Sequence, residues 1–202
     1  MMMKTKIGFL LFLVFVLSSK SISYAEPVLD ADGEPLRTGV EYYAVTNDRG
    51  LSLSRSQGCP YNVILELTLQ NYESPVTFRS LDPSVTTINT SVALNVVSVL
   101  GEDSNQCPDQ SLAWKLSENP STGIWDVTTG GAAGNPDASA SQFQIVRLGP
   151  SYAFHFCPPG CSCTLLGASA GSVDPLEIRL SLSTSGGGLV FSFKKVNNNI
   201  FV

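Results

Sequence analysis

Short runs of strand-forming residues, separated by turn-forming residues, are the feature that most constrains the fold of this 202-residue chain. The runs are rich in leucine and in the β-branched and aromatic residues that favour extended backbone. Glycine, proline, asparagine, aspartate and serine cluster between them. Helical periodicity is absent, so the pattern predicts an all-β protein. The runs lie at Tyr42–Thr46, Val63–Leu69, Val92–Val99, Ala113–Leu116, Phe143–Leu148, Ala153–Phe156, Leu176–Leu182 and Leu189–Phe193.

The last two runs predict a hairpin. Residues 183–188 separate Leu176–Leu182 from Leu189–Phe193 and include Gly186, Gly187 and Gly188. Consecutive glycines permit the positive φ angles that a tight hairpin turn requires. We therefore expect these two strands to pair with each other.

Many short antiparallel strands in one domain fit either a sandwich or a closed barrel. Aromatic strands recur at residues 41–45, 124–127, 141–145 and 190–194. One third of the chain without its amino-terminal segment is about 59 residues, a plausible length for a four-stranded repeat. The pattern is therefore compatible with a threefold β-trefoil.

The amino terminus predicts a secretory signal peptide over residues 1–25. Lys4 and Lys6 precede the apolar run Ile7–Leu17, and Ser23-Tyr24-Ala25 supplies the small residues of a cleavage site. The run is shorter than the roughly 20 apolar residues that span a bilayer. We expect a secreted chain in which residues 26–202 form a single domain, with no membrane association after cleavage.

Charge argues against nucleic acid as a partner. The predicted signal peptide contains three of the 12 basic residues and none of the 17 acidic residues. Nine basic residues then remain against 17 acidic ones, a formal net charge of −8. Such a body repels both nucleic acid and anionic membrane surfaces.

All five cysteines lie in the predicted mature chain, where an oxidising compartment favours disulfides. They are Cys59, Cys107, Cys157, Cys161 and Cys163. Only two of the last three can pair within one chain, so one thiol is left over. We expect no metal site, because four ligands at a recognised spacing are missing and His155 is the only histidine.

We expect neither an enzyme nor a cofactor. Gly167–Gly171 matches the Gly-x-Ser-x-Gly pattern of hydrolases, but no helix pattern follows it and His155 precedes it. The glycine-rich segment Thr129–Gly134 lacks the lysine and helix needed to bind phosphate.

Four other residues of chemically versatile types have structural interpretations. Asp30 and Asp32 belong to an Asp-x-Asp-Gly sequence, which is ordinary turn chemistry. Trp114 and Trp125 lie within strand patterns, so we expect both in the core or lining the barrel.

Several segments together resemble the plant Kunitz-type, or soybean-trypsin-inhibitor-like, family. They are Val28–Leu36, Tyr42-Tyr43, Gly58-Cys59-Pro60, Trp114 after Cys107, Tyr152–Pro158 and Phe191–Lys195. The resemblance implies a β-trefoil of twelve short antiparallel strands in three pseudo-repeats. It also implies a Cys59–Cys107 disulfide and a second disulfide from Cys157 to Cys161 or Cys163.

In that family, function resides in an exposed loop between the first two cysteines. A loop already held in an extended shape enters a protease cleft with little ordering entropy. Counting from Cys59 as in the family places the loop at Ser80, Leu81, Asp82, Pro83, Ser84, Val85 and Thr86. The resemblance implies a monomeric endopeptidase inhibitor, directed at a serine protease or, alternatively, a cysteine protease.

The loop departs from the trypsin-directed pattern, which places arginine or lysine at the scissile position. No basic residue lies between Ser80 and Ser111, and equal spacing lands on Pro83. Thr38 stands where the family has an asparagine whose side chain braces the loop, so we expect this side-chain brace to be missing. We therefore expect a target other than trypsin, with Leu81 as the residue suited to an apolar pocket. The alternative is a non-inhibitory trefoil that serves storage, carbohydrate binding or defence.

Asn89-Thr90-Ser91 is an N-glycosylation sequon. In a secreted chain Asn89 is therefore a candidate glycosylation site close to the predicted loop.

Overall fold

The computed structural model describes residues 25–54, 58–67, 74–101, 104–171 and 176–196. All of the predicted signal peptide except Ala25 lies outside these residues. No helix in the described ranges is long and apolar enough to cross a membrane. The strands are β1 (Glu41–Thr46), β2 (Arg49–Leu53), β3 (Val63–Leu67), β4 (Val76–Ser80), β5 (Leu94–Ser98), β6 (Lys115–Glu118), β7 (Trp125–Thr128), β8 (Phe143–Leu148), β9 (Ser151–Phe156), β10 (Thr164–Ala170), β11 (Ile178–Leu182) and β12 (Ser192–Lys195).

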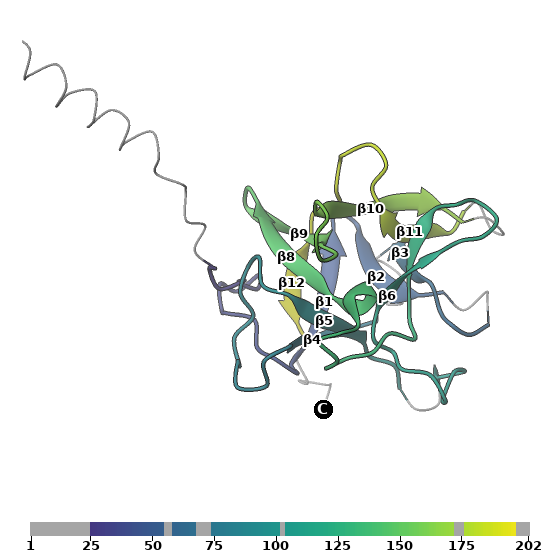
Figure 1. The fold of residues 1–202 in the computed structure, drawn as a ribbon. Helices are drawn as coiled ribbons and strands as arrows, with labels where there is room; N and C mark the ends of the chain where they lie inside the picture. The colour runs from purple at the N-terminus through teal and green to yellow at the C-terminus, as the bar shows by residue number, and fades with distance from the viewer. Residues whose placement is uncertain (1–24, 55–57, 68–73, 102–103, 172–175, 197–202) are drawn as a thin grey trace, which may run out of the picture.

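Six strands close into a barrel. β1 pairs with both β12 and β4, and antiparallel pairing continues from β4 to β5, β8 and β9. A bridge between Tyr152 of β9 and Phe191, which directly precedes β12, completes the ring. In Figure 1 these strands lie to the left of the molecule.

Three hairpins, β2–β3, β6–β7 and β10–β11, cover one end of the barrel and are called the cap below. β11 pairs with β3 and with β7, and a bridge between Asn62 and Thr128 links the other two hairpins. The hairpins lie to the right in Figure 1. A six-stranded barrel capped by three hairpins is a β-trefoil, so the expected fold is confirmed.

The core is a cluster of aromatic rings inside the barrel. Phe78, Phe154 and Phe193 are fully buried, and the Phe78 and Phe193 ring centroids are 5.3 Å apart in an edge-on arrangement. Trp114 packs on Phe154 at 5.5 Å and donates from its Nε1 to the Ser98 hydroxyl at 2.8 Å. Edge-on packing of this kind stabilises a core beyond simple burial.

The prediction for Trp114 is confirmed, but that for Trp125 is wrong. Trp125 is 44% exposed at the start of β7. Side chains alternate between the two faces of a strand, and the inward position beside it belongs to Asp126.

The predicted hairpin between residues 176–182 and 189–193 is also wrong. β11 pairs with β10, whereas β12 pairs with β1. The glycine run instead crosses β10: a Cβ at Gly188 would lie 2.9 Å from the Cβ of Leu165. The amide of Leu189 donates to the carbonyl of Leu166 at 2.9 Å. Gly188 is needed for this close approach, whereas Gly186 has a left-handed φ of 77° but does not form a hairpin between β11 and β12.

β2, β4, β7 and β10 lie outside the eight predicted runs, although the recurring aromatic segment 124–127 overlaps β7. β10 contains the sequence Gly167-Ala168-Ser169-Ala170, whose small residues carry little strand propensity. It includes most of the Gly-x-Ser-x-Gly match, so the serine sits within a strand and not on a strand-to-helix turn.

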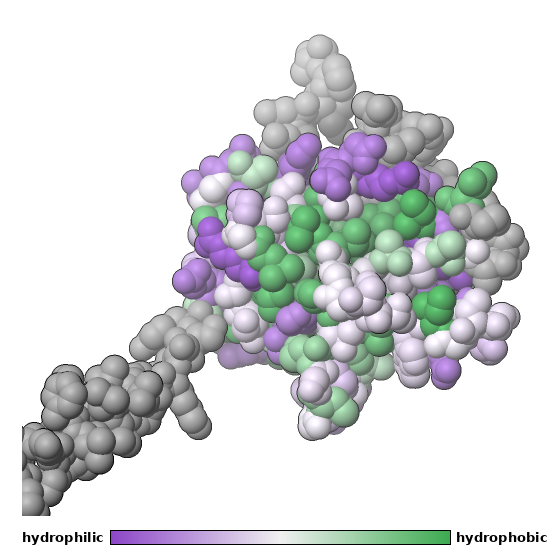
Figure 2. Space-filling view, turned by 90° about the horizontal axis from the view of Figure 1, so that it is seen from above, coloured by the Kyte–Doolittle hydropathy of each residue, from purple (hydrophilic) through white to green (hydrophobic). Residues whose placement is uncertain are grey.

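Apolar side chains also reach the surface. Seen from above the view of Figure 1, they gather in the middle of the visible face with polar side chains around them (Figure 2). Among the described residues, the large exposed apolar side chains are those of Val92, Trp125, Leu148, Leu176 and Val190.

Candidate functional site

The predicted loop projects from the end of the barrel opposite the cap. β1 runs toward the cap hairpin β2, and antiparallel β4 runs back, so Ser80 at the end of β4 lies at the open end. Residues 81–93 then connect to β5. Asp82, Pro83 and Ser84 are exposed, whereas Leu81 and Val85 are partly buried. The tip is thus accessible, and its flanking apolar residues contact the body.

Hydrogen bonds within the tip hold it in one shape. The Asp82 carboxylate accepts from the backbone amide of Ser84 at 2.9 Å and from its hydroxyl at 2.7 Å. The Val85 amide donates to the Asp82 carbonyl at 3.1 Å, and the Asp82 amide donates to the Ser80 hydroxyl at 3.1 Å. The hydrogen bond from the Ser84 hydroxyl is the larger cause of a lowered pKa of Asp82, and the hydrogen bond from the Ser84 amide lowers this pKa further.

Thr38 braces the loop from the side. Its hydroxyl donates to the Val85 carbonyl at 3.0 Å, and its amide donates to the Thr86 carbonyl at 2.9 Å. Arg37 forms a bridge with Thr87 and donates from Nη1 to the Thr87 hydroxyl at 3.3 Å. The expectation that Thr38 leaves the loop without a side-chain brace is therefore wrong. A short side chain suffices because the backbone at Thr38 already lies beside the loop.

The amino-terminal segment Val28–Leu36 anchors the far side of the loop. The Val28 amide donates to the Ile88 carbonyl at 2.9 Å, and the Ile88 amide donates to the Leu36 carbonyl at 2.9 Å. The Leu36 amide donates to the Val28 carbonyl at 2.8 Å. All three side chains are buried. Backbone hydrogen bonds to this buried segment therefore fix the position of the chain where the loop returns to the body.

The Asp-x-Asp-Gly turn shapes this anchor. Asp30 accepts through Oδ1 from the amides of Asp32 at 3.0 Å and Glu34 at 2.9 Å. Gly33 has a φ of 84°, a left-handed conformation that favours glycine. The two aspartates therefore form a turn, as predicted.

Asn89 lies just beyond the braced segment. It forms a bridge with Pro27 and is partly exposed. Thr90, the middle residue of the sequon, is buried, and its hydroxyl accepts from the Glu26 amide at 3.0 Å. A glycan on Asn89 would stand beside the loop, at the open end of the barrel.

The two disulfides join Cys59 to Cys107 and Cys157 to Cys163. The first confirms the expected pairing, and the second selects Cys163 from the two alternatives. In the described part of the chain, Cys161 is the free cysteine, and it is exposed.

His155 lies beside the second disulfide. One ring nitrogen and the sulfurs of Cys157 and Cys163 are within 4.8 Å of one another. Both sulfurs are bonded to each other and do not offer the thiolates that a zinc site uses. Burial lowers the pKa of His155, which favours the neutral ring.

Sequence reasoning missed a buried charge cluster in the cap. Arg179 of β11 contacts Glu177 at 2.7 Å through Nε and Asp126 of β7 at 3.3 Å through Nη1. Glu177 also accepts from the Ser54 hydroxyl, and Asp126 accepts from the Ser169 hydroxyl at 3.2 Å. These residues occupy three hairpins, so no local spacing in the sequence indicates that they meet.

The protein is therefore a β-trefoil whose rigid barrel presents a braced, exposed loop at its open end, as binding proteins commonly do. Residues 28–195 match the legume Kunitz family, described as trypsin and protease inhibitors. The chain belongs to this family.

Known relatives cover almost the whole chain. It is 34% identical to a 21 kDa seed protein of Theobroma cacao over 98% of this chain and 96% of the relative. It is 32% identical to miraculin of Synsepalum dulcificum over 89% of this chain and 87% of the relative. Among solved structures, a Kunitz-type cysteine protease inhibitor from potato is similar, with 25% identity and a TM-score of 0.69. That match covers 87% of this chain and all of the potato chain.

Proposed function

We propose that this chain is a secreted, monomeric inhibitor of a serine endopeptidase other than trypsin. The observation that supports this proposal is the loop Ser80–Thr86, which is exposed at its tip and bonded to Thr38 through its backbone. A loop held in this way enters a protease cleft without a large loss of conformational entropy. Family membership supports protease inhibition, and the absence of arginine and lysine from the loop supports a target with an apolar pocket.

Leu81 is the residue that would fill that pocket. It is the largest apolar side chain of the loop and is partly exposed at the end of β4. A leucine in an apolar pocket gains about 1.5–3 kcal/mol from burial. Chymotrypsin-like and subtilisin-like proteases are therefore the targets to examine first, with papain-like cysteine proteases as the alternative.

Leu81→Asp tests this function directly. A carboxylate in an apolar pocket loses its hydration without a partner, so inhibition should fall by at least about 100-fold. Inhibition constants should be measured for chymotrypsin, subtilisin, elastase and papain. Leu176→Asp is the matched control, because Leu176 is 88% exposed and lies outside the loop. Equal inhibition by the two variants would show that Leu81 is not the contact residue.

A non-inhibitory role is the second candidate. It is supported by two relatives, named as a seed protein and as miraculin, whose names do not mention a protease. If micromolar mature protein leaves all four proteases fully active, the inhibitor proposal fails and this role is preferred.

The location and modification of the chain follow from its amino terminus and sequon. We propose that residues 1–25 direct the chain into the secretory pathway, to the cell exterior or a vacuole. Asn89 is proposed to carry a glycan that narrows the range of proteases able to approach the loop. Mass spectrometry of the secreted chain, before and after glycosidase treatment, tests both the cleavage after Ala25 and the modification.

A further inference from the structure

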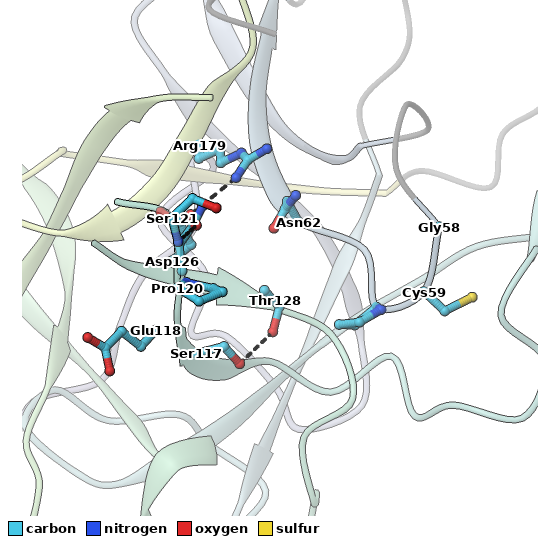
Figure 3. Close-up of a pocket in the computed structure, with 12 residues that line it drawn as sticks. Gly58, Cys59, Asn62, Ser117, Glu118, Pro120, Ser121, Asp126, Thr128 and Arg179 are labelled. Atoms are coloured by element: carbon cyan, nitrogen blue, oxygen red, sulfur yellow. Dashed lines mark hydrogen bonds and ion pairs between the residues drawn. The ribbon is translucent and has the colours of Figure 1, made fainter. Parts of the chain in front are cut away.

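A polar pocket opens in the cap, at the opposite end of the molecule from the loop. Its volume is about 390 Å³, within the range of small-molecule binding sites. Residues from all three hairpins line it. In Figure 3, Asn62, Asp126, Thr128 and Arg179 lie around it, whereas the side chains of Glu118 and Cys59 point outward. The lining residues are Gly58, Cys59, Pro60, Asn62, Ser117, Glu118, Asn119, Pro120, Ser121, Asp126, Thr128 and Arg179.

Arg179 lines the pocket, and one of its hydrogen-bond donors has no partner among the described residues. Its side chain is only 3% exposed, and its Nε and Nη1 atoms are bound by Glu177 and Asp126. Among the described residues, Nη2 of Arg179 is the buried side-chain polar atom without a hydrogen-bond partner. A buried donor of this kind is costly to leave unpaired. An acceptor oxygen that came within hydrogen-bond distance of Nη2 would remove that cost.

The other polar groups determine what kind of ligand could supply this oxygen. Asp126 is buried and accepts hydrogen bonds, and Glu118 lies exposed at the rim. Thr128 and Ser117 place two hydroxyls 3.1 Å apart, joined by a dashed line in Figure 3. An anion would face the Asp126 carboxylate, and a cation would face the guanidinium. A neutral group that both donates and accepts is compatible with all of them.

We infer that this pocket binds a neutral, multiply hydroxylated ligand, the chemical class to which sugars belong. A ring carrying several hydroxyls can accept a hydrogen bond from Arg179 and donate one to Asp126. It can also form hydrogen bonds with the hydroxyls of Ser117 and Thr128. The site does not depend on the loop, because cap-hairpin residues line the pocket whereas the loop connects β4 to β5 at the open end of the barrel. Failure of the proposed inhibitory function would therefore leave this inference intact.

The experiment titrates the isotope-labelled mature chain with glucose, galactose, N-acetylglucosamine, maltose and cellobiose by NMR. At least one sugar should produce saturable shifts at the amides of Asn62, Asp126 and Thr128, with millimolar or tighter affinity. Potassium phosphate is the anionic comparison and should produce no saturable shift there. Leu81→Asp should bind the same sugar with unchanged affinity.

Arg179→Lys removes the unpaired donor but keeps the charge, and it should weaken binding by about tenfold. Because this side chain is buried, Ser121→Tyr gives an independent test. Ser121 is exposed at the rim, so tyrosine would block the pocket without entering the core. Ser185→Tyr, at an exposed serine outside the pocket, is the matched control and should bind normally.

Three outcomes would overturn the inference. The first is the absence of saturable shifts with every sugar, which would indicate a pocket occupied by water only. The second is a response to phosphate alone. The third is equal sugar affinity in Ser121→Tyr and Ser185→Tyr, which would place the contact elsewhere.

Discussion

Single side chains decide how rigid the loop is. Thr38 supplies the only side-chain bond from the amino-terminal segment to the carbonyl of Val85 that the described residues show. The hydrogen bond from the backbone amide of Thr38 to the Thr86 carbonyl does not involve the side chain, so it survives substitution. The hydroxyl can therefore be removed without removing the whole brace.

Thr38→Val preserves shape and deletes the hydroxyl. A typical hydrogen bond contributes about 0.5–1.5 kcal/mol, so we expect up to about tenfold weaker inhibition of a susceptible protease. Hydrogen exchange at the amide of Val85 should accelerate in parallel. Thr184→Val, at an exposed threonine distant from the loop, serves as the control. Unchanged exchange at Val85 would show that the brace is unnecessary.

Asp82 makes the tip sensitive to acid. Its pKa is lowered in the folded loop by bonds from the hydroxyl and amide of Ser84, so the folded state binds its proton less readily than the unfolded state does. The tip is therefore fully ordered above the usual aspartate pKa and loosens as pH falls through the lowered folded value. The Ser84 amide shift, followed by NMR against pH, should titrate with Asp82 and become pH-independent in Asp82→Asn. A Ser84 shift that ignores pH in the native chain would refute this link.

At the level of strands and turns, close backbone approaches impose requirements that hydrophobic patterns do not show. Gly188 allows the chain to cross Leu165 of β10 between β11 and β12, two strands that pair with different partners instead of with each other. Gly131 lies even closer to its neighbours: a Cβ there would be 2.3 Å from the Trp114 carbonyl oxygen and 2.8 Å from the Ser141 hydroxyl.

Gly131→Ala should consequently destabilise the fold. The added methyl group would force apart the segments around buried Trp114, and overpacking of this kind costs about 1–3 kcal/mol. Urea unfolding followed by tryptophan fluorescence measures the change in the free energy of unfolding. Gly187→Ala is the control, because its Cβ would meet nothing nearer than 3.9 Å. A similar midpoint of urea unfolding for both variants would contradict the close approach of Gly131 to its neighbours.

On the scale of the whole molecule, the Cys59–Cys107 disulfide joins segments 48 residues apart. It ties the chain before β3 to the connection between β5 and β6. The Cys157–Cys163 disulfide spans only six residues. In the chain-entropy model a longer closed loop restricts the unfolded state more strongly.

Replacing both Cys59 and Cys107 by serine should lower the free energy of unfolding by about 2–5 kcal/mol. The same replacement at Cys157 and Cys163 should cost about 2 kcal/mol less, because the loop it opens is shorter. Denaturant unfolding of the two variants gives the comparison. Equal losses would indicate that local strain, and not loop length, governs both disulfides.

Local signals carried much of the prediction. The alternation of strand-forming and turn-forming residues predicts most strands, the turn at Asp30 and the buried Trp114, because backbone propensity and turn chemistry act over a few residues. The motifs around Cys59, Cys107 and Cys157 indicated the trefoil and the first disulfide through family resemblance. The strands with small residues, notably β10, were not predicted, because tertiary pairing overrides weak strand propensity.

The sequence by itself determined the all-β class, the turn chemistry and the position of a loop without basic residues. Only the tertiary structure decided which strands pair, that Thr38 bonds to Val85 and that Arg179 meets Asp126 from another hairpin. The physical reason is that propensity depends on neighbouring residues, whereas the Thr38–Val85 and Arg179–Asp126 contacts join residues 47 and 53 positions apart. They form only when the barrel closes and brings distant segments together.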